Sequence, residues 1–282
     1  METTVHDVLR DALCATLSEL EDVLDSDVMV FTGPIFGGPE NEFLSIIEDI
    51  AKEKKHTKLA IMLTTNGGSA TVVERYVNIV RQNYDKVIFI VPDYAYSAGT
   101  IFCMSGDEIW MDYFSVLGPI DPQVPNKDGK YVPALGYLDK IAELVEKAKN
   151  NQLTNAEFLI LKDFDLAELK GYEQAKELTI TLLQDWLVKY KFKNWNRHSN
   201  GDAVTNEEKR IRAQEIATKL GDYNIWKTHV RPINIKLLES LKLKINDYSK
   251  DETKRSVIRK YYKLMSGFVV EGKLFIHTRK FL

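Results

Sequence analysis

One serine, Ser97, stands among residues whose types suit a nucleophile. It follows the apolar run 87–91, which Pro92 closes, and it precedes the small residues Ala98 and Gly99. We expect the apolar run to form a strand and the small residues to open a helix. Backbone N–H groups and the helix dipole at a helix N-terminus favour developing negative charge. The pattern therefore predicts a nucleophilic serine at a strand-to-helix junction.

Two consecutive glycines upstream of the serine predict a tight backbone turn at the end of another strand. The apolar segment 58–63 leads into Gly67 and Gly68, and a further turn falls at Gly118. In sheets of parallel strands, ligands bind beyond the carboxyl ends of the strands. We therefore expect the two glycines, Gly118 and Ser97 to gather at one edge of a sheet.

Apolar runs alternate with segments of helical periodicity along the first part of the chain. Strands separated by such helices indicate a parallel sheet with right-handed crossovers. The predicted fold class is α/β, with a largely parallel sheet and added helices. Strands are expected at 28–31, 58–63, 87–91 and 107–111, and helices at 3–24, 40–53 and 207–220. A further helix contains Val72 to Val80, between the second and third strands, and residues 234–242 form a helix or a turn.

The chain divides into three predicted parts. Residues 1–26 form an amphipathic N-terminal helix, residues 27–245 the main domain, and residues 246–282 a C-terminal extension. The main domain includes a strongly charged helical insertion at about 134–193, in which residues 156–190 form either one long helix or a kinked pair.

Composition limits the classes of function. The 282 residues carry a formal net charge of -3, which gives no electrostatic reason to expect nucleic acid as a partner. No apolar run approaches the roughly 18 residues that span a bilayer, and acids occur throughout the first helix, unlike in a signal peptide. Cys14 and Cys103 lack metal-ligand spacing, and Cys103 is expected to be a buried thiol. We expect a cytoplasmic protein without metal or cofactor.

Four ordered motifs resemble the serine dehydrogenase proteinase family, which belongs with the Clp protease proteolytic subunit and signal peptide peptidase A on the Clp/crotonase fold. The close resemblance covers roughly residues 58–124, and a weaker one reaches residue 245. Each motif alone would be weak, whereas their ordered combination is specific. The motifs are TNGGS at 65–69, VPDYAYSAGT at 91–100, DEI at 107–109 and VLGPIDPQ at 116–123.

The resemblance implies a spiral of ββα units in which Ser97 is the nucleophile of a peptide hydrolase that forms an acyl-enzyme. It further implies that the backbone N–H groups of Gly68 and Ala98 form the oxyanion hole, while Gly67 allows close approach of the backbone. A tetrahedral oxyanion needs such preorganised donors. The implied partners are a polypeptide substrate, further copies of the chain and a regulatory protein.

The resemblance leaves the general base open. Where the Clp subunit carries its histidine base this sequence has Asp121 and Pro122, and the segment 131–134 has no lysine at the place matching the base of the signal-peptide-peptidase type. His229 is one candidate, because its segment is the one that carries the catalytic aspartate in the Clp subunit. The alternative is a histidine that caps or packs a loop. The other four histidines are interpreted as surface residues: His6, His56, His198 and His277.

Three further residues complete the candidate set. Lys140 could act as a base if it were desolvated, but the neighbouring acids Asp139 and Glu143 favour a charged, solvated lysine. Asp165 could orient His229 or another base, or lie on a helix surface. Asp121 is interpreted as a turn residue, because Asp-Pro favours turns.

Three functions fit these observations. The first is a cytoplasmic serine peptidase. The second is a catalytically silent or partner-activated member of the fold that acts as a scaffold or sensor in an assembly, since both familiar base positions lack a base. Acyl-CoA chemistry is the third, because crotonases share the fold, but a serine at a strand exit beside two glycines suits peptide hydrolysis better.

Overall fold

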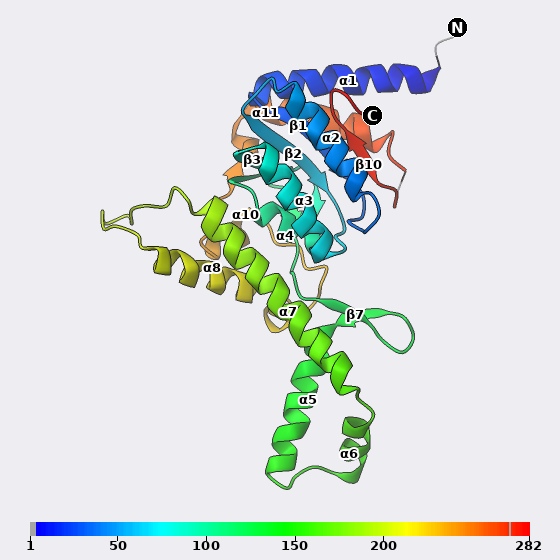
Figure 1. Ribbon diagram of the computed structural model, residues 1–282, viewed down its shortest axis with the longest axis vertical. Coiled ribbons are helices and arrows are strands. Elements are labelled where there is room, and N and C mark those ends of the chain that lie inside the picture. Colours follow the sequence, from blue (N-terminus) through cyan, green and yellow to red (C-terminus); the bar gives the residue numbers. More distant parts are fainter. Residues whose placement is uncertain (1–3, 271) are drawn as a thin grey trace.

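A six-stranded sheet forms the centre of the protein (Figure 1). The computed structural model describes residues 4–270 and 272–282. All neighbouring strands in the sheet are parallel except the pair β10 and β1, so the predicted α/β class with a largely parallel sheet is confirmed. In spatial order the strands are β10 (Phe275–His277), β1 (Asp27–Thr32), β2 (Lys58–Thr64), β3 (Lys86–Val91), β5 (Glu108–Met111) and β9 (Asn246–Asp247).

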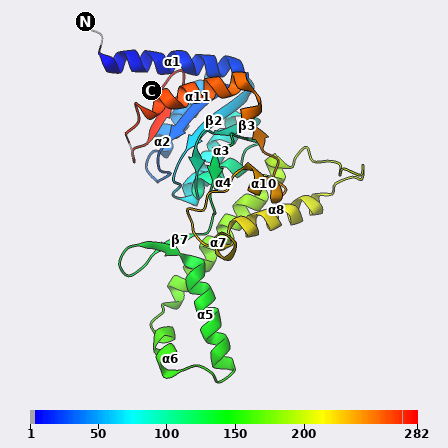
Figure 2. The ribbon, with the colours of Figure 1, turned by 180° about the vertical axis from the view of Figure 1, so that it is seen from behind.

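The central strands are apolar on both faces because helices cover both sides of the sheet. On one side lie α2 (Glu40–Lys52), α3 (Ala70–Asn83) and α4 (Ala98–Met104). On the other lie α1 (Val5–Leu24) and α11 (Glu252–Ser266), which pack against each other (Figure 2). The fold is therefore three-layered. Strands β1, β2, β3 and β5 and helices α1, α2 and α3 match the predicted positions to within a few residues, whereas α11, β9 and β10 were not predicted.

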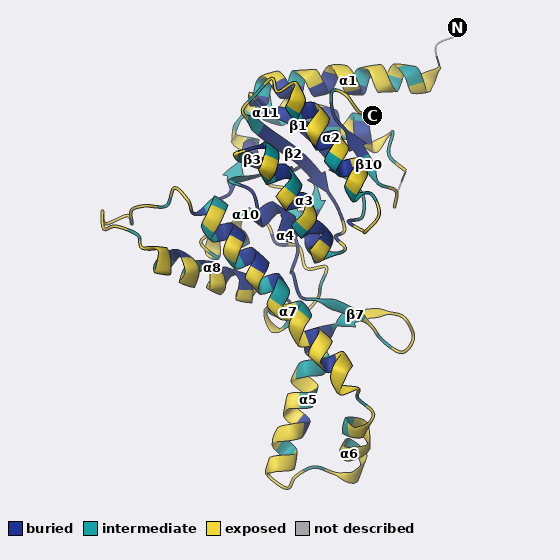
Figure 3. Cartoon of the chain, in the orientation of Figure 1, coloured by how far each residue is buried: buried dark blue, intermediate teal, exposed yellow. Residues whose placement is uncertain are grey.

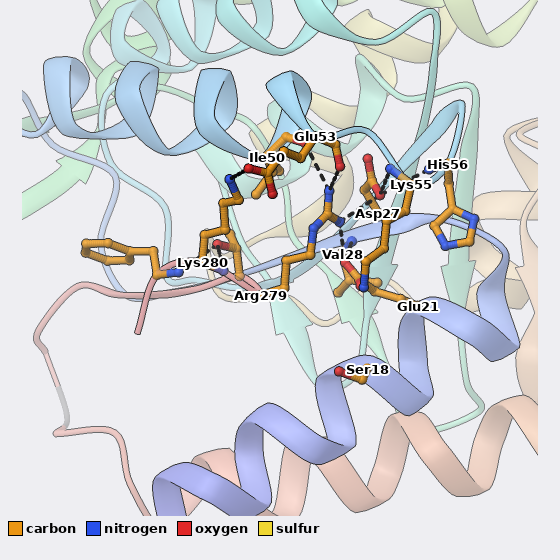
Figure 4. Close-up of polar contacts among 12 residues, drawn as sticks. Ser18, Glu21, Asp27, Val28, Ile50, Glu53, Lys55, His56, Arg279 and Lys280 are labelled. Atoms are coloured by element: carbon orange, nitrogen blue, oxygen red, sulfur yellow. Dashed lines mark hydrogen bonds and ion pairs between the residues drawn. The ribbon is translucent and has the colours of Figure 1, made fainter.

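The C-terminal segment supplies both edge strands of the sheet. Strand β9 pairs with β5, and β10 pairs antiparallel with β1. Just after β10, the Arg279 guanidinium donates hydrogen bonds to Glu21 Oε1 and Asp27 Oδ1, both at 2.8 Å (Figure 4). It also donates to the backbone oxygens of Ile50 and Glu53. The sheet thus continues across the predicted boundary at residue 245, and Arg279 joins the chain end to α1 and β1.

A helical arm projects from the sheet and is exposed over most of its surface (Figures 1 and 3). It consists of α5 (Ala134–Lys149), α6 (Asn155–Lys162) and the outer part of α7 (Leu166–Trp186). The chain breaks between α6 and α7, where Asp165 caps the second helix, so residues 156–190 do not form one helix. A π-helical turn, η1 (Leu187–Lys191), extends α7.

Short elements connect the arm to the sheet. A hairpin of β7 (Gln123–Pro125) and β8 (Tyr131–Pro133) precedes α5. Thr205 caps α8 (Asn206–Leu220), which packs along α7. The remaining elements are β4 (Tyr94–Ala95), β6 (Val116–Leu117), α9 (Tyr223–Trp226), α10 (Ile235–Ser240) and the 3-10 turn η2 (Tyr248–Lys250).

One histidine prediction is wrong. His277 lies on β10 and is fully buried, with a hydrogen bond between its Nδ1 and the Tyr261 hydroxyl, whereas we expected it at the surface. Burial lowers its pKa to about 4, so the ring is neutral at physiological pH. Its place in an edge strand, covered by α1 and α11, explains the difference.

Candidate active site

Ser97 occupies a strained turn between β4 and α4. Its φ of 52° and ψ of -117° are unusual for a residue with a side chain. Neighbouring backbone bonds hold this turn. The Tyr96 N–H donates to the Thr65 oxygen at 2.9 Å, and the Gly99 N–H donates to the Tyr96 oxygen at 2.8 Å. The turn therefore presents the serine at the N-terminus of α4, as predicted.

The two glycines pass directly against this turn. A Cβ at Gly67 would lie 2.7 Å from the Tyr96 oxygen and 2.8 Å from the Ser97 Cβ. A Cβ at Gly68 would lie 1.9 Å from the Ile35 backbone oxygen. Both residues also have positive φ, of 100° and 145°, which glycine adopts without steric cost. Only glycine lets the backbone come this close to the serine turn at Gly67 and to Ile35 at Gly68.

Two backbone donors near Ser97 are unused. Within residues 4–270 and 272–282, no hydrogen bond engages the N–H of Gly68 or that of Ala98. The neighbouring donors are engaged, since Gly67 N–H donates to Thr65 Oγ1 at 2.9 Å and Ser69 N–H donates to the Ile35 oxygen at 2.8 Å. The two residues expected to form an oxyanion hole thus keep their donors available for a bound anion.

Four chain segments lie side by side next to the serine turn. Thr65 pairs with Ala95 and Ala95 with Leu117, both in parallel, and Leu117 pairs with Ile233 in the antiparallel sense. Because parallel segments advance together, the register places Gly67 beside Ser97, two residues beyond the first pair. The Thr100 hydroxyl joins the turn to the third segment, accepting from the Gly118 N–H at 3.0 Å and donating to the Ala95 oxygen at 2.8 Å.

The antiparallel pair brings together two residues that are far apart in the sequence. Asp121 lies four positions after Leu117, and His229 lies four positions before Ile233, in a turn where the Arg231 N–H donates to the Thr228 oxygen at 3.2 Å. Their side chains are joined by a 2.8 Å hydrogen bond between His229 Nδ1 and Asp121 Oδ1. The structure thus pairs a histidine and a carboxylate on segments adjacent to the serine turn.

The Asp121 carboxylate is nearly inaccessible, with 1% of its side chain exposed. Its second oxygen accepts a 2.7 Å hydrogen bond from Gln123 Nε2. The prediction that Asp121 is a turn residue is wrong, because the chain passes through Pro122 directly into the extended strand β7. His229 keeps 20% of its side chain exposed, and its Nε2 has no hydrogen-bond partner in the part of the chain that the structure describes.

The other two candidates lie on helices of the arm. Lys140, on α5, is half exposed and donates hydrogen bonds to both carboxylate oxygens of Glu143, at 3.0 and 2.9 Å. Asp165 caps α7 by accepting hydrogen bonds from the N–H groups of Ala167 and Glu168. Within the part of the chain that the structure describes, neither side chain makes a hydrogen bond or ion pair with Ser97, Asp121 or His229.

Sequence reasoning missed the roles of Asp121, Gln123 and Thr100. A signal was present for the first two, since both belong to the last of the four motifs, and a carboxylate in a motif close to a candidate nucleophile is itself a candidate orienting group. Among the described residues, no group of three or more His, Cys, Asp or Glu side chains is arranged to hold a metal ion. Cys103 is buried, as expected.

The strained serine turn beside two glycines, at the end of a largely parallel sheet, is the arrangement that the four motifs predicted. The chain belongs to the family described as the ClpP-like SDH-type serine proteinase, whose sequence profile matches residues 39–268. This membership confirms the resemblance that the four motifs indicated.

Two uncharacterised proteins of Methanocaldococcus jannaschii are similar in sequence. MJ1495 is 30% identical over 220 residues, which are 78% of this chain and 60% of the relative, so this chain spans only part of that protein's length. MJ0137 is 26% identical over 222 residues, covering 71% of this chain and 70% of the relative.

Solved structures show a more distant likeness. The 1510-N membrane-bound stomatin-specific protease, in a mutant form, shares 19% identity, covers 67% of this chain and 84% of its own, and has a TM-score of 0.34. A mutant of ClpP1 from Listeria monocytogenes shares 12% identity, covers 56% and 82% of the two chains, and has a TM-score of 0.32. Within the described residues of the present chain, no helix is both long enough and apolar enough to cross a membrane.

Proposed function

We propose that this protein is a serine peptidase that cleaves peptide bonds through an acyl-enzyme at Ser97. The observation that carries the proposal is the arrangement around the serine turn. The turn has two unused backbone donors on one side and a paired histidine and carboxylate on the adjacent segments. Membership of a serine proteinase family supports the same conclusion.

In the proposed mechanism, Asp121 accepts the Nδ1 hydrogen of His229 and so leaves Nε2 free to act as the base. His229 removes the Ser97 hydroxyl proton as the oxygen attacks the substrate carbonyl. The N–H groups of Gly68 and Ala98 donate to the resulting oxyanion, and protonated His229 then gives its proton to the leaving amine. Water, activated by the same histidine, hydrolyses the acyl-enzyme.

This assignment exchanges two positions relative to the Clp subunit. The acid, Asp121, stands where that subunit carries its histidine, and His229 stands in the segment that carries its aspartate. The hydrogen bond between His229 and Asp121 supports this exchanged arrangement, because a histidine paired with a carboxylate can act as the base whichever chain segment supplies each of the two residues. Lys140 and Asp165 take no part in the proposed mechanism, since each is engaged on the arm.

A second candidate is a member of the fold that becomes active only with a partner or in an assembly. One observation favours it: within the described residues, the Ser97 hydroxyl makes no hydrogen bond, to His229 or to any other group. Apolar side chains of α6, at Phe158, Leu159 and Ile160, are also exposed, as an assembly surface requires. Light scattering after size-exclusion chromatography tests whether the chain forms a homo-oligomer.

Reaction with a fluorophosphonate probe tests the peptidase proposal. Wild type is expected to be labelled at Ser97 and to hydrolyse an unstructured polypeptide, whereas Ser97→Ala loses both reactions. His229→Ala is expected to lose turnover, and Lys140→Ala to keep it. Absence of labelling in wild type, alone and as the isolated oligomer, would refute the peptidase proposal. Labelling confined to the oligomer would favour the second candidate.

A further inference from the structure

A large cavity lies at the end of the sheet opposite the serine turn. Lys86 and Glu108, at the amino ends of β3 and β5, form part of its wall, whereas Ser97 follows the carboxyl end of β3. The other walls come from residues 190–195 after α7, Arg212 of α8 and the segment 239–246. Its volume of about 930 Å³ is enough for a ligand of nucleotide size.

The cavity wall carries an excess of positive charge that the protein does not neutralise. Two of its lysines are paired, Lys86 with Glu108 at 2.7 Å and Lys193 with Asp107 at 3.1 Å. Three other lysines make no ion pair or side-chain hydrogen bond among the described residues, and Glu239 is the one lining carboxylate without an ion pair there. These lysines are Lys191, Lys242 and Lys244.

Lys191 is the most unusual of the three. It ends the π-helical turn η1, a rare backbone form that often occurs at functional sites. Its ammonium lies deep among protein atoms although the residue as a whole is partly exposed, and this desolvation lowers its pKa to about 8. Lys244 lowers the pKa further, while Glu108, Cys103 and Asp107 act in the opposite direction. An anion bound between the two amines would relieve their repulsion.

The aromatic residues that line the cavity differ in whether a ligand could stack on them. Phe192 is buried. The Arg81 guanidinium lies over the Tyr190 ring, with its carbon 3.7 Å from the ring centroid, so that face of Tyr190 is occupied. Trp195 is partly exposed and meets Phe192 edge to face, with ring centroids 5.6 Å apart. Trp195 also meets His198 in a T-shaped contact, with ring centroids 5.7 Å apart. A partly exposed indole offers a stacking surface for a planar group such as a base.

We propose that this cavity binds a nucleoside phosphate, with its phosphates between Lys191 and Lys244 and its base against Trp195. The two features of the wall match the two parts of such a ligand: unpaired amines for the phosphates and a partly exposed indole for the base. The site is separate from the proposed peptidase site and does not depend on it.

Isothermal titration of the full chain with ADP and, separately, with inorganic pyrophosphate tests the proposal. We expect saturable binding of ADP that weakens at least tenfold in Lys191→Met and in Lys244→Met. Lys189→Met is the matched control, because Lys189 lies in the same π-helical turn but outside the cavity wall, and it should bind ADP as wild type does. Trp195→Ala should weaken ADP binding and leave pyrophosphate binding unchanged.

Two results would overturn the proposal. One is the absence of saturable ADP binding at millimolar concentration, and the other is pyrophosphate binding as tight as that of ADP, which would leave the nucleoside unrecognised. A second measurement covers variants that fail to fold. In wild type, ADP should slow acylation of Lys191 by an amine-directed reagent, measured by mass spectrometry, without slowing acylation of Lys189. Equal rates with and without ADP would contradict the assignment.

Discussion

Replacement of Asp121 by asparagine tests the proposed role of the buried pair most sharply. The change keeps the shape of the side chain and removes its charge. In the wild-type protein, the Asp121 carboxylate accepts hydrogen bonds from His229 Nδ1 at 2.8 Å and from Gln123 Nε2 at 2.7 Å. An asparagine has only one oxygen for these two donors. If its NH₂ group faces the ring, His229 must carry its proton on Nε2 and can no longer accept the serine proton.

Two outcomes are possible for the variant, and they differ in how far turnover falls. If the histidine is held in the wrong tautomer, we expect turnover to fall about 10⁴-fold, or about 5.4 kcal/mol in transition-state stabilisation. If the Gln123 amide rotates and accepts from the asparagine NH₂, the asparagine oxygen still faces Nδ1 and only the charge is lost. Charge-assisted hydrogen bonds exceed neutral ones by about 1–2 kcal/mol, which corresponds to a fall of about 5- to 30-fold in turnover.

A second variant separates these two cases. In Asp121→Asn/Gln123→Glu, the glutamate can only accept, so it directs the asparagine NH₂ toward itself and the asparagine oxygen toward His229. Turnover of the double variant should therefore exceed that of Asp121→Asn if the wrong tautomer causes the loss. The readouts are the rate of fluorophosphonate labelling and the turnover of a polypeptide substrate.

Asp165→Asn is the matched control, because Asp165 is also an aspartate but caps α7 on the arm. It should keep full turnover and lose at most about 1 kcal/mol of stability, since asparagine is also a good helix cap. Turnover of Asp121→Asn within twofold of wild type, or a larger loss in Asp165→Asn, would refute the assignment of Asp121 as the orienting acid.

Three further predictions concern stability and are measured by urea unfolding. Gly68→Ala should fail to fold or lose several kcal/mol because its Cβ would meet backbone at 1.9 Å, whereas Gly171→Ala, with open space in a helix interior, should gain about 0.5–1 kcal/mol; equal stabilities would contradict the account of the glycine turn. Arg279→Met should lower the free energy of unfolding by about 3–5 kcal/mol. The Arg279 side chain is only 10% exposed, and its loss removes an ion-pair partner from the buried carboxylates of Glu21 and Asp27. An unchanged stability would show that these carboxylates find other partners. The pKa of Lys191 is lowered to about 8 in the folded protein from the ordinary value of 10.5. Between these pH values the unfolded chain binds more protons than the folded one, so the free energy of unfolding rises with pH across that window. Lys191→Met should reduce this rise, and an unchanged pH profile would contradict the prediction.

Local patterns were sufficient for the central sheet and the serine turn. Strands β2 and β3 are unbroken apolar runs, which only a sheet covered on both faces accommodates, so their type and position follow from composition. Ser97, Gly67 and Gly68 could also be singled out from the sequence, because a glycine pair after an apolar run indicates a tight turn and small residues after a strand indicate the start of a helix. Their close contacts, of Gly67 with Tyr96 and of Gly68 with Ile35, depend on the tertiary structure. The edge strand β10 was not predicted, since it has three residues and depends on pairing with β1 across most of the chain.

The partners of the serine were decided by tertiary structure. The sequence by itself gave His229 as one candidate base among alternatives and interpreted Asp121 as a turn residue, because the two are 108 positions apart and no local pattern relates them. The antiparallel bridge between Leu117 and Ile233 brings their two segments together, and there a buried carboxylate meets a partly exposed imidazole. Residue types along the chain thus determine which groups can do chemistry, whereas the packing of distant segments determines which of them meet.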